Sequence, residues 1–182
     1  MSALKHLLAE LPEVATHLRL DLGAVLDGGA LGPPERWGVA VAVALASRSR
    51  RLAEALIASR PEEVTLGTVE DALSAASLMG VTNVFYRFRH LVGKPTYDHK
   101  PARLRMKRLA MPATTLAAFE LFALAVSTVN GCELCVRSHE ATLLEDGTTE
   151  DQIHDAVRIA SVVHGTAVAL DGASLIPQAL HD

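Results

Sequence analysis

The 182-residue sequence has few aromatic residues and little net charge. Phe, Trp and Tyr make up only 4% of a chain that is 49% hydrophobic, so Ala, Leu and Val must fill the core. That composition favours closely packed helices over strands. A net charge of −4 provides no basic footprint for nucleic acid or for an anionic membrane. We therefore expect an all-α protein that binds neither.

Long hydrophobic runs are also missing. The apolar stretches 37–46 and 116–129 are too short to span a bilayer, and Glu120 interrupts the second. Lys5 and Glu13 fall where an export signal would need an unbroken apolar stretch. We expect a cytoplasmic protein, and in that compartment thiols are kept reduced.

The length suits one helical domain, residues 1–182, with a core shared by two halves. The first half, residues 1–93, carries no recognisable chemistry, and the second half, residues 112–182, carries the cysteines. Between them, residues 94–111 form a basic connector, read as a solvated segment or as a docking surface for an acidic partner. Apolar periodicity and capping signals predict two short helices within 2–26, one long helix at 35–59, and further helices at 69–79, 81–91, 116–129 and from about 148 onward.

The two halves also resemble each other in sequence. Gly67 to Asp71 matches Gly147 to Asp151 at four of five positions. We interpret this as a degenerate helical repeat, in which an 85-residue offset places Ser47 and Arg50 opposite the cysteines. A chance similarity of helix composition is the alternative.

Cysteine is scarce, with two copies only. Cys132 and Cys135 are separated by two residues, and His139 follows four residues later. On a helix these positions, i, i+3 and i+7, lie along one stripe. Cβ atoms at the i, i+3 spacing are about 5–6 Å apart, near the range that a disulfide tolerates. The pattern therefore predicts a dithiol that can open and close.

A thiol of ordinary pKa, about 8.5, is mostly protonated at neutral pH and needs activation to become a nucleophile. A chain break at Asn130-Gly131 would place Cys132 at a helix N-terminus, where the dipole favours an anion. His139 lies one turn beyond Cys135 and is a candidate base. Glu120 is a carboxylate in an apolar stretch that needs water or a partner. If the chain reverses near the break, Glu120 returns beside the motif.

Other interpretations remain open at this point. The cysteines could be inert core residues, and His139 and Glu120 ordinary helix residues. Met79, like the other methionines, is read as core filler. A structural zinc site would need a ligand beyond Cys132, Cys135 and His139, and the residues available for this are His154 and His164.

The pattern Glu-x11-Cys-x2-Cys-x3-His, with the basic sequence at 101–106 in an all-helical chain of this length, resembles the alkyl hydroperoxidase D (AhpD) proteins of the carboxymuconolactone decarboxylase-like superfamily. The resemblance implies an all-α protomer, usually in a homotrimer, that reduces alkyl hydroperoxides without a metal or a tightly bound cofactor. It also implies regeneration of a partner peroxiredoxin. The electrons would come from the dihydrolipoyl group of a lipoylated acyltransferase, recharged by dihydrolipoamide dehydrogenase.

By position, the resemblance implies that Cys135 is oxidised to a sulfenic acid, with its proton relayed through Glu120 and His139. Cys132 would be the proton donor and the resolving thiol that closes the disulfide. Well-known members have a histidine directly before the second cysteine, where this chain has Leu134, so one auxiliary proton carrier is missing. The alternative functions are a protein disulfide reductase with little peroxidase activity and a zinc-stabilised helical interaction module.

Overall fold

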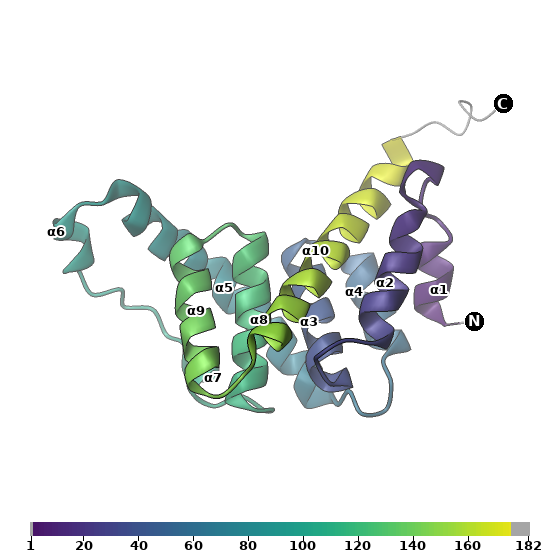
Figure 1. The fold of residues 1–182 in the computed structure, drawn as a ribbon. Coiled ribbons are helices and arrows are strands. Elements are labelled where there is room, and N and C mark those ends of the chain that lie inside the picture. The colour runs from purple at the N-terminus through teal and green to yellow at the C-terminus, as the bar shows by residue number, and fades with distance from the viewer. Residues whose placement is uncertain (1, 176–182) are drawn as a thin grey trace.

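A computed structural model describes residues 2–175, and within that range every regular element is a helix (Figure 1). This confirms the predicted all-α class. The α-helices are α1 (Ala3–Leu8), α2 (His17–Asp27), α3 (Pro33–Ala46), α4 (Arg50–Ser59), α5 (Leu66–Val92), α6 (Pro95–Asp98), α7 (Lys107–Ala110), α8 (Leu116–Val129), α9 (Glu133–Glu145) and α10 (Glu150–Gly172). Two short 3-10 helices, Glu13–Ala15 and Ala173–Leu175, complete the described part. No helix in this part of the chain combines the length and apolarity needed to cross a membrane.

Helices α3 and α8 form the centre of the core. Helix α3 packs against α4, α5, α8 and α10, and α8 packs against α5, α9 and α10 as well. Residues 39–44 of α3 and 118–127 of α8 are all buried, as expected for helices that are covered on every side. At Gly38 a Cβ atom would lie 2.1 Å from the Phe122 ring, so only glycine allows these two helices to approach so closely.

The single helix predicted at 35–59 is wrong, because the chain turns between α3 and α4. Arg48 has φ +59°, the left-handed conformation, and the N–H groups of Arg48 and Ser49 donate to the carbonyls of Leu45 and Ala44. This is a Schellman helix end, usually made by glycine. The alanine-rich sequence carries no glycine here, and a left-handed non-glycine residue costs about 1–2 kcal/mol, so no local signal announces the turn.

The helices predicted at 69–79 and 81–91 are one continuous helix, α5. Its N-cap is Thr65, whose hydroxyl accepts from the Thr68 N–H, and its C-terminal cap is Gly93 with φ +61°. Gly80, which separates the two predicted ranges, and Gly67, just before the first, both lie inside the helix. The predicted starts of α8, capped by Thr115, and of α10 near residue 148 are confirmed.

The two halves share one element order, α3–α4–α5 and α8–α9–α10. The turn after α8 repeats the hydrogen bonds of the turn after α3, with its left-handed residue, Gly131, 83 positions further on. With this 83-residue offset, Ser49 and Leu52 correspond to the cysteines. The 85-residue offset from the sequence had matched Ser47 and Arg50 to them. The duplication itself stays a prediction.

The basic connector, residues 94–111, is attached to α5 by Asp71. This fully buried carboxylate accepts from the Arg108 guanidinium at 2.7 Å, from the Ala113 N–H at 3.1 Å, and from the N–H and hydroxyl of Thr114 at 2.7 and 2.8 Å. Burial favours the neutral acid, but these hydrogen bonds outweigh it and hold the pKa of Asp71 below its usual value. One ionised side chain thus fixes where the connector returns to the core.

Candidate active site

The turn between α8 and α9 positions the first cysteine. Gly131 has φ +65°, its N–H donates to the Thr128 carbonyl, and the Cys132 N–H donates to the Ser127 carbonyl. This Schellman end reverses the chain and leaves Cys132 as the N-cap of α9. The predicted break at Asn130-Gly131, with Cys132 at a helix N-terminus, is confirmed.

Cys132 and Cys135 form a disulfide, with their Cα atoms 5.3 Å apart, inside the range of ordinary disulfides. Cys132 is 1% exposed and lies behind the surface, whereas Cys135 is 7% exposed and lines a cavity. The two sulfurs therefore differ in access. A small molecule that enters the cavity meets Cys135.

Glu120 and His139 meet across the α8–α9 reversal, as predicted. Glu120 Oε2 lies 2.6 Å from His139 Nδ1, and both side chains are at least four-fifths buried. A contact this short requires a proton between the two groups, donated by either the imidazole or the carboxylic acid. Burial keeps water from competing for this hydrogen bond, and His139 lies one turn beyond Cys135 on α9.

Met79 is part of this site and was missed from the sequence. Its Sδ atom lies 3.3 Å from His139 Nε2 and 3.6 Å from both Thr82 Oγ1 and Asn83 Nδ2. The imidazole is therefore held on both edges, by Glu120 at Nδ1 and by Met79 at Nε2. A methionine among apolar residues looks like core filler in a sequence, and only the packing of α5 against α9 reveals this contact.

The cavity beside Cys135 has a volume of about 370 Å³ and is mostly apolar. Helix α5, the connector and α9 form its walls, through Met79, Thr82, Tyr86, Met106, Leu109, Leu134, Cys135, Ser138 and His139. This size suits a small organic molecule. Leu134 is 43% exposed and adds to the apolar wall, at the position where the resemblance would place a histidine.

The zinc alternative receives no support from the geometry. His164 Nδ1 lies 2.9 Å from the hydroxyl of Ser47, at the end of α3. Among residues 2–175 no group of three or more His, Cys, Asp or Glu side chains is placed to hold a metal ion.

Fold and site together define an all-helical dithiol protein with a buried Glu–His pair beside the more accessible sulfur. Residues 95–176 match the carboxymuconolactone decarboxylase family. A protein of Anaeromyxobacter dehalogenans (strain 2CP-C), named alkyl hydroperoxide reductase AhpD, is 58% identical over 171 residues, which cover 94% of this chain and 92% of that protein. Proteins of the same name from Solibacter usitatus and Rhodospirillum centenum are 44% and 40% identical, and the aligned regions cover 92% and 93% of this chain and 95% and 91% of those proteins. The chain belongs to the AhpD family, as the motif suggested.

Proposed function

We propose that this protein is a peroxide-reducing oxidoreductase that acts on alkyl hydroperoxides through the Cys132–Cys135 pair. The observation that carries the proposal is Cys135 in the wall of an apolar cavity, with the Glu120–His139 pair in the same site and its disulfide partner behind it. Family membership supports the reaction type, because the relatives are named alkyl hydroperoxide reductases.

The cycle begins from the reduced dithiol. The Cys135 thiolate attacks the terminal peroxide oxygen, the O–O bond breaks, and the alkoxide takes a proton from Cys132 to leave as an alcohol. Cys135 is now a sulfenic acid. The Cys132 thiolate then attacks the Cys135 sulfur and displaces hydroxide, which takes the Cys135 proton held by the His139–Glu120 pair and leaves as water. Two electrons have passed from the dithiol to the peroxide.

Glu120 and His139 act as the proton relay in this proposal. His139 accepts the Cys135 proton before attack and passes it toward Glu120, and the short contact between them supports such a transfer. Leu134 cannot carry a proton, so the relay has no auxiliary member on the cavity side. We infer that water reaching the cavity completes the path.

We propose that a dihydrolipoyl group on a lipoylated acyltransferase reduces the disulfide by thiol exchange and is recharged by dihydrolipoamide dehydrogenase. The cycle then needs no metal or tightly bound cofactor, and it can also regenerate a partner peroxiredoxin. The connector supports docking of an acidic partner, because its exposed face carries cations and its apolar residues Met106 and Leu109 line the cavity. The exposed cations are Lys94, Lys100, Arg103, Arg105 and Lys107.

We also propose that the chain assembles as a cytoplasmic homotrimer. The support is an apolar stripe on α5 at helical spacing, about half exposed or more along its length. Its residues are Leu73, Val81, Val84, Phe88 and Leu91. Sedimentation at micromolar concentration tests the assembly, and a monomer would contradict it.

Thiol titration tests the dithiol cycle. Reduced protein treated with one equivalent of an alkyl hydroperoxide should lose both of its thiols and release one equivalent of alcohol, without crosslinking between chains. With Cys132→Ser, Cys135 should still react once and stop at the sulfenic acid, which a dimedone adduct reveals by mass spectrometry. With Cys135→Ser, peroxide consumption should be abolished.

Two results would contradict parts of this proposal. If Cys135→Ser stays active and Cys132→Ser is dead, the assignment of the two thiols is reversed. If the wild-type thiols survive peroxide but the protein still reduces disulfides of other proteins, it is a disulfide reductase and not a peroxidase.

A further inference from the structure

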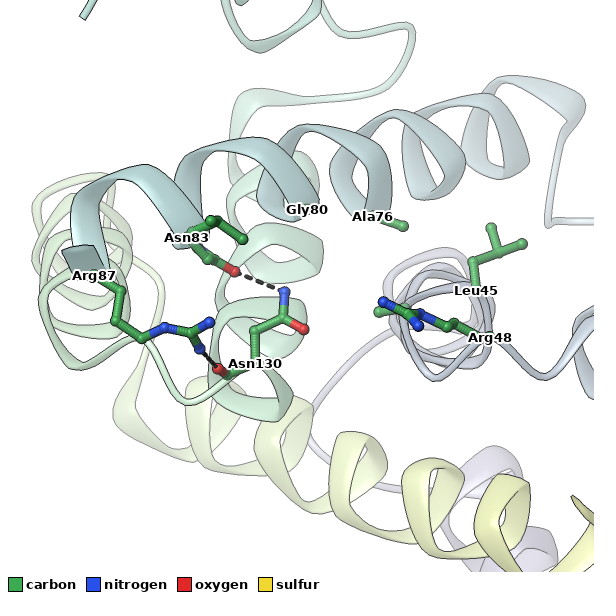
Figure 2. Close-up of a pocket in the computed structure, with 9 residues that line it drawn as sticks. Leu45, Arg48, Ala76, Gly80, Asn83, Arg87 and Asn130 are labelled. Carbon is green, nitrogen blue, oxygen red and sulfur yellow. Dashed lines mark hydrogen bonds between the residues drawn. The ribbon is translucent and has the colours of Figure 1, made fainter.

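A second cavity, of about 430 Å³, lies on the neighbouring face of α5 (Figure 2). The end of α3, the middle of α5 and the turn at Asn130 enclose it. Its lining residues are Leu45, Ala46, Arg48, Ala76, Gly80, Asn83, Val84, Arg87 and Asn130. None of them lines the cavity beside Cys135, so the proposed peroxidase cycle does not explain this space.

Two guanidinium groups reach toward this cavity, and no acidic residue lines it. Figure 2 shows Arg48 extending from the end of α3 and Arg87 from α5, with the Asn130 side chain between them. Arg87 donates one hydrogen bond to the Asn130 carbonyl, which leaves further N–H donors of its five. Among residues 2–175 the Arg48 guanidinium has no hydrogen-bond or ion-pair partner.

Arg48 occupies a position where the backbone favours glycine. It has φ +59°, and at the matching point of the turn after α8 the chain has Gly131 with φ +65°. An arginine at this position therefore has a conformational cost that a glycine would not have.

Gly80 is the reverse case, a glycine at a position where the backbone favours another residue. It lies inside α5, where alanine is the better helix former, and a Cβ atom at this position would meet no atom within 4 Å. Packing within the chain therefore does not require glycine. The space that a side chain would fill is this second cavity, and glycine keeps it open.

We propose that the second cavity binds a small molecule that carries an oxyanion, a carboxylate or a phosphate, on a short apolar body. Arg48 would bind the oxyanion directly, since a planar guanidinium suits carboxylate and phosphate oxygens, and Arg87, on the other side of Asn130, would add positive charge. Leu45 and Ala76 would contact the apolar part. The volume is that of a small-molecule site.

Arg48 is the sharper position to test, because Arg87 also holds the turn that leads to Cys132. Isothermal titration of the full-length protein, in its native assembly, with inorganic phosphate and separately with butyrate should show one saturable site per chain for at least one probe. The probe that binds distinguishes a phosphate from a carboxylate ligand. Arg48→Gln should weaken that binding at least about tenfold, the loss expected for a charged hydrogen-bonding partner.

Two further variants separate binding from folding. Arg48→Gly should abolish binding and yet raise the melting temperature, because it removes the left-handed arginine. Gly80→Leu should block the cavity while the chain stays folded. Matched controls are Gly23→Leu, at a helical glycine in α2 that is equally free of contacts, and Arg50→Gln, at an exposed arginine paired with Glu54, and both should leave binding unchanged.

The proposal is overturned if neither probe binds the wild-type protein at millimolar concentration. Binding that Arg48→Gln and Gly80→Leu leave unchanged overturns it as well. If neither probe binds and Arg48→Gln alters the sedimentation coefficient, the cavity receives a group from a second copy of the chain. That is an alternative because Val84 belongs to the apolar stripe of α5.

Discussion

Replacing Asp71 with asparagine should loosen the connector from α5 and destabilise the protein. The Asp71 carboxylate is fully buried and accepts four hydrogen bonds, one oxygen serving Arg108 and Ala113 and the other serving the N–H and hydroxyl of Thr114. Asparagine keeps the shape but replaces one oxygen by an NH2 group and removes the charge. The substitution therefore changes the chemistry of the contact and leaves its packing intact.

The cost can be worked out bond by bond. The Thr114 hydroxyl can rotate and accept from the new amide, but the Thr114 N–H loses its acceptor, and an unsatisfied buried donor costs about 1–3 kcal/mol. The bonds from Arg108 and Ala113 lose their negatively charged acceptor, which removes about another 1 kcal/mol. We expect a total of about 2–4 kcal/mol, and a melting temperature lower by roughly 5–15 °C for a chain of this size.

Urea unfolding followed by circular dichroism measures this loss, and Glu70→Gln is the matched control. Glu70 is the neighbouring carboxylate, lies 3.2 Å from the same Arg108 and is 68% exposed, so its substitution should change stability by less than about 0.5 kcal/mol. Comparing Asp71→Asn with Glu70→Gln separates the effect of burial and hydrogen bonding from the effect of losing one charge. If Asp71→Asn unfolds at the wild-type urea concentration, or if both variants lose equal stability, the reasoning is refuted.

The difference between wild type and Asp71→Asn should also depend on pH. The pKa of Asp71 is lowered in the folded state, where its hydrogen bonds outweigh the opposing effect of burial, so its stabilisation is fully present above the unfolded pKa of about 3.9. It is lost as the pH falls through the lower folded value. The gap between the two unfolding curves should stay constant from pH 7 to pH 5 and narrow below about pH 4. A gap that persists unchanged at pH 3 would show that the charge is irrelevant.

The other predictions concern the site and the assembly. Glu120→Gln keeps the side-chain volume but removes the proton acceptor, and should slow peroxide consumption about 10²-fold in a stopped-flow assay; an unchanged rate would remove Glu120 from the relay. Met79→Leu should cost less than about 1.5 kcal/mol in urea and still lower the rate, since His139 loses its Nε2 contact, and equal rates would show that Met79 only fills space. Leu134→His restores a proton carrier in the cavity wall and should raise the rate about tenfold or more at neutral pH; a rate at or below wild type would contradict its role. Phe88→Glu charges the exposed apolar stripe of α5 and should produce smaller species in sedimentation, whereas an unchanged sedimentation coefficient would place any interface elsewhere.

The all-α class and the environment of the cysteines could be predicted because their signals are local. Few aromatics and many alanines indicated helices, and Thr115 and Gly131 marked the ends of α8. A carboxylate inside an apolar stretch needed a partner, and the chain reversal at Gly131 indicated which residue that partner is. The Glu120–His139 contact joins residues 19 positions apart through one turn, so it was within reach of sequence reasoning.

The break between α3 and α4 could not be predicted, because Arg48 takes up the left-handed conformation without the glycine that normally signals it. Gly67 and Gly80 suggested helix boundaries, yet both lie inside α5, whose packing against α3 and α8 outweighs their low helix propensity.

The amino-acid sequence by itself determined the helical class, the spacing of Cys132 and Cys135, and the reversal that returns Glu120 to His139. The tertiary structure alone decided that Met79, 60 residues away from His139, holds the other edge of the imidazole, and that Cys135 rather than Cys132 faces the cavity. The physical reason is the distance along the chain over which each interaction acts. Helix periodicity, caps and glycine turns act over a few residues and leave a pattern in the sequence, whereas contacts between packed helices depend on shape and leave none.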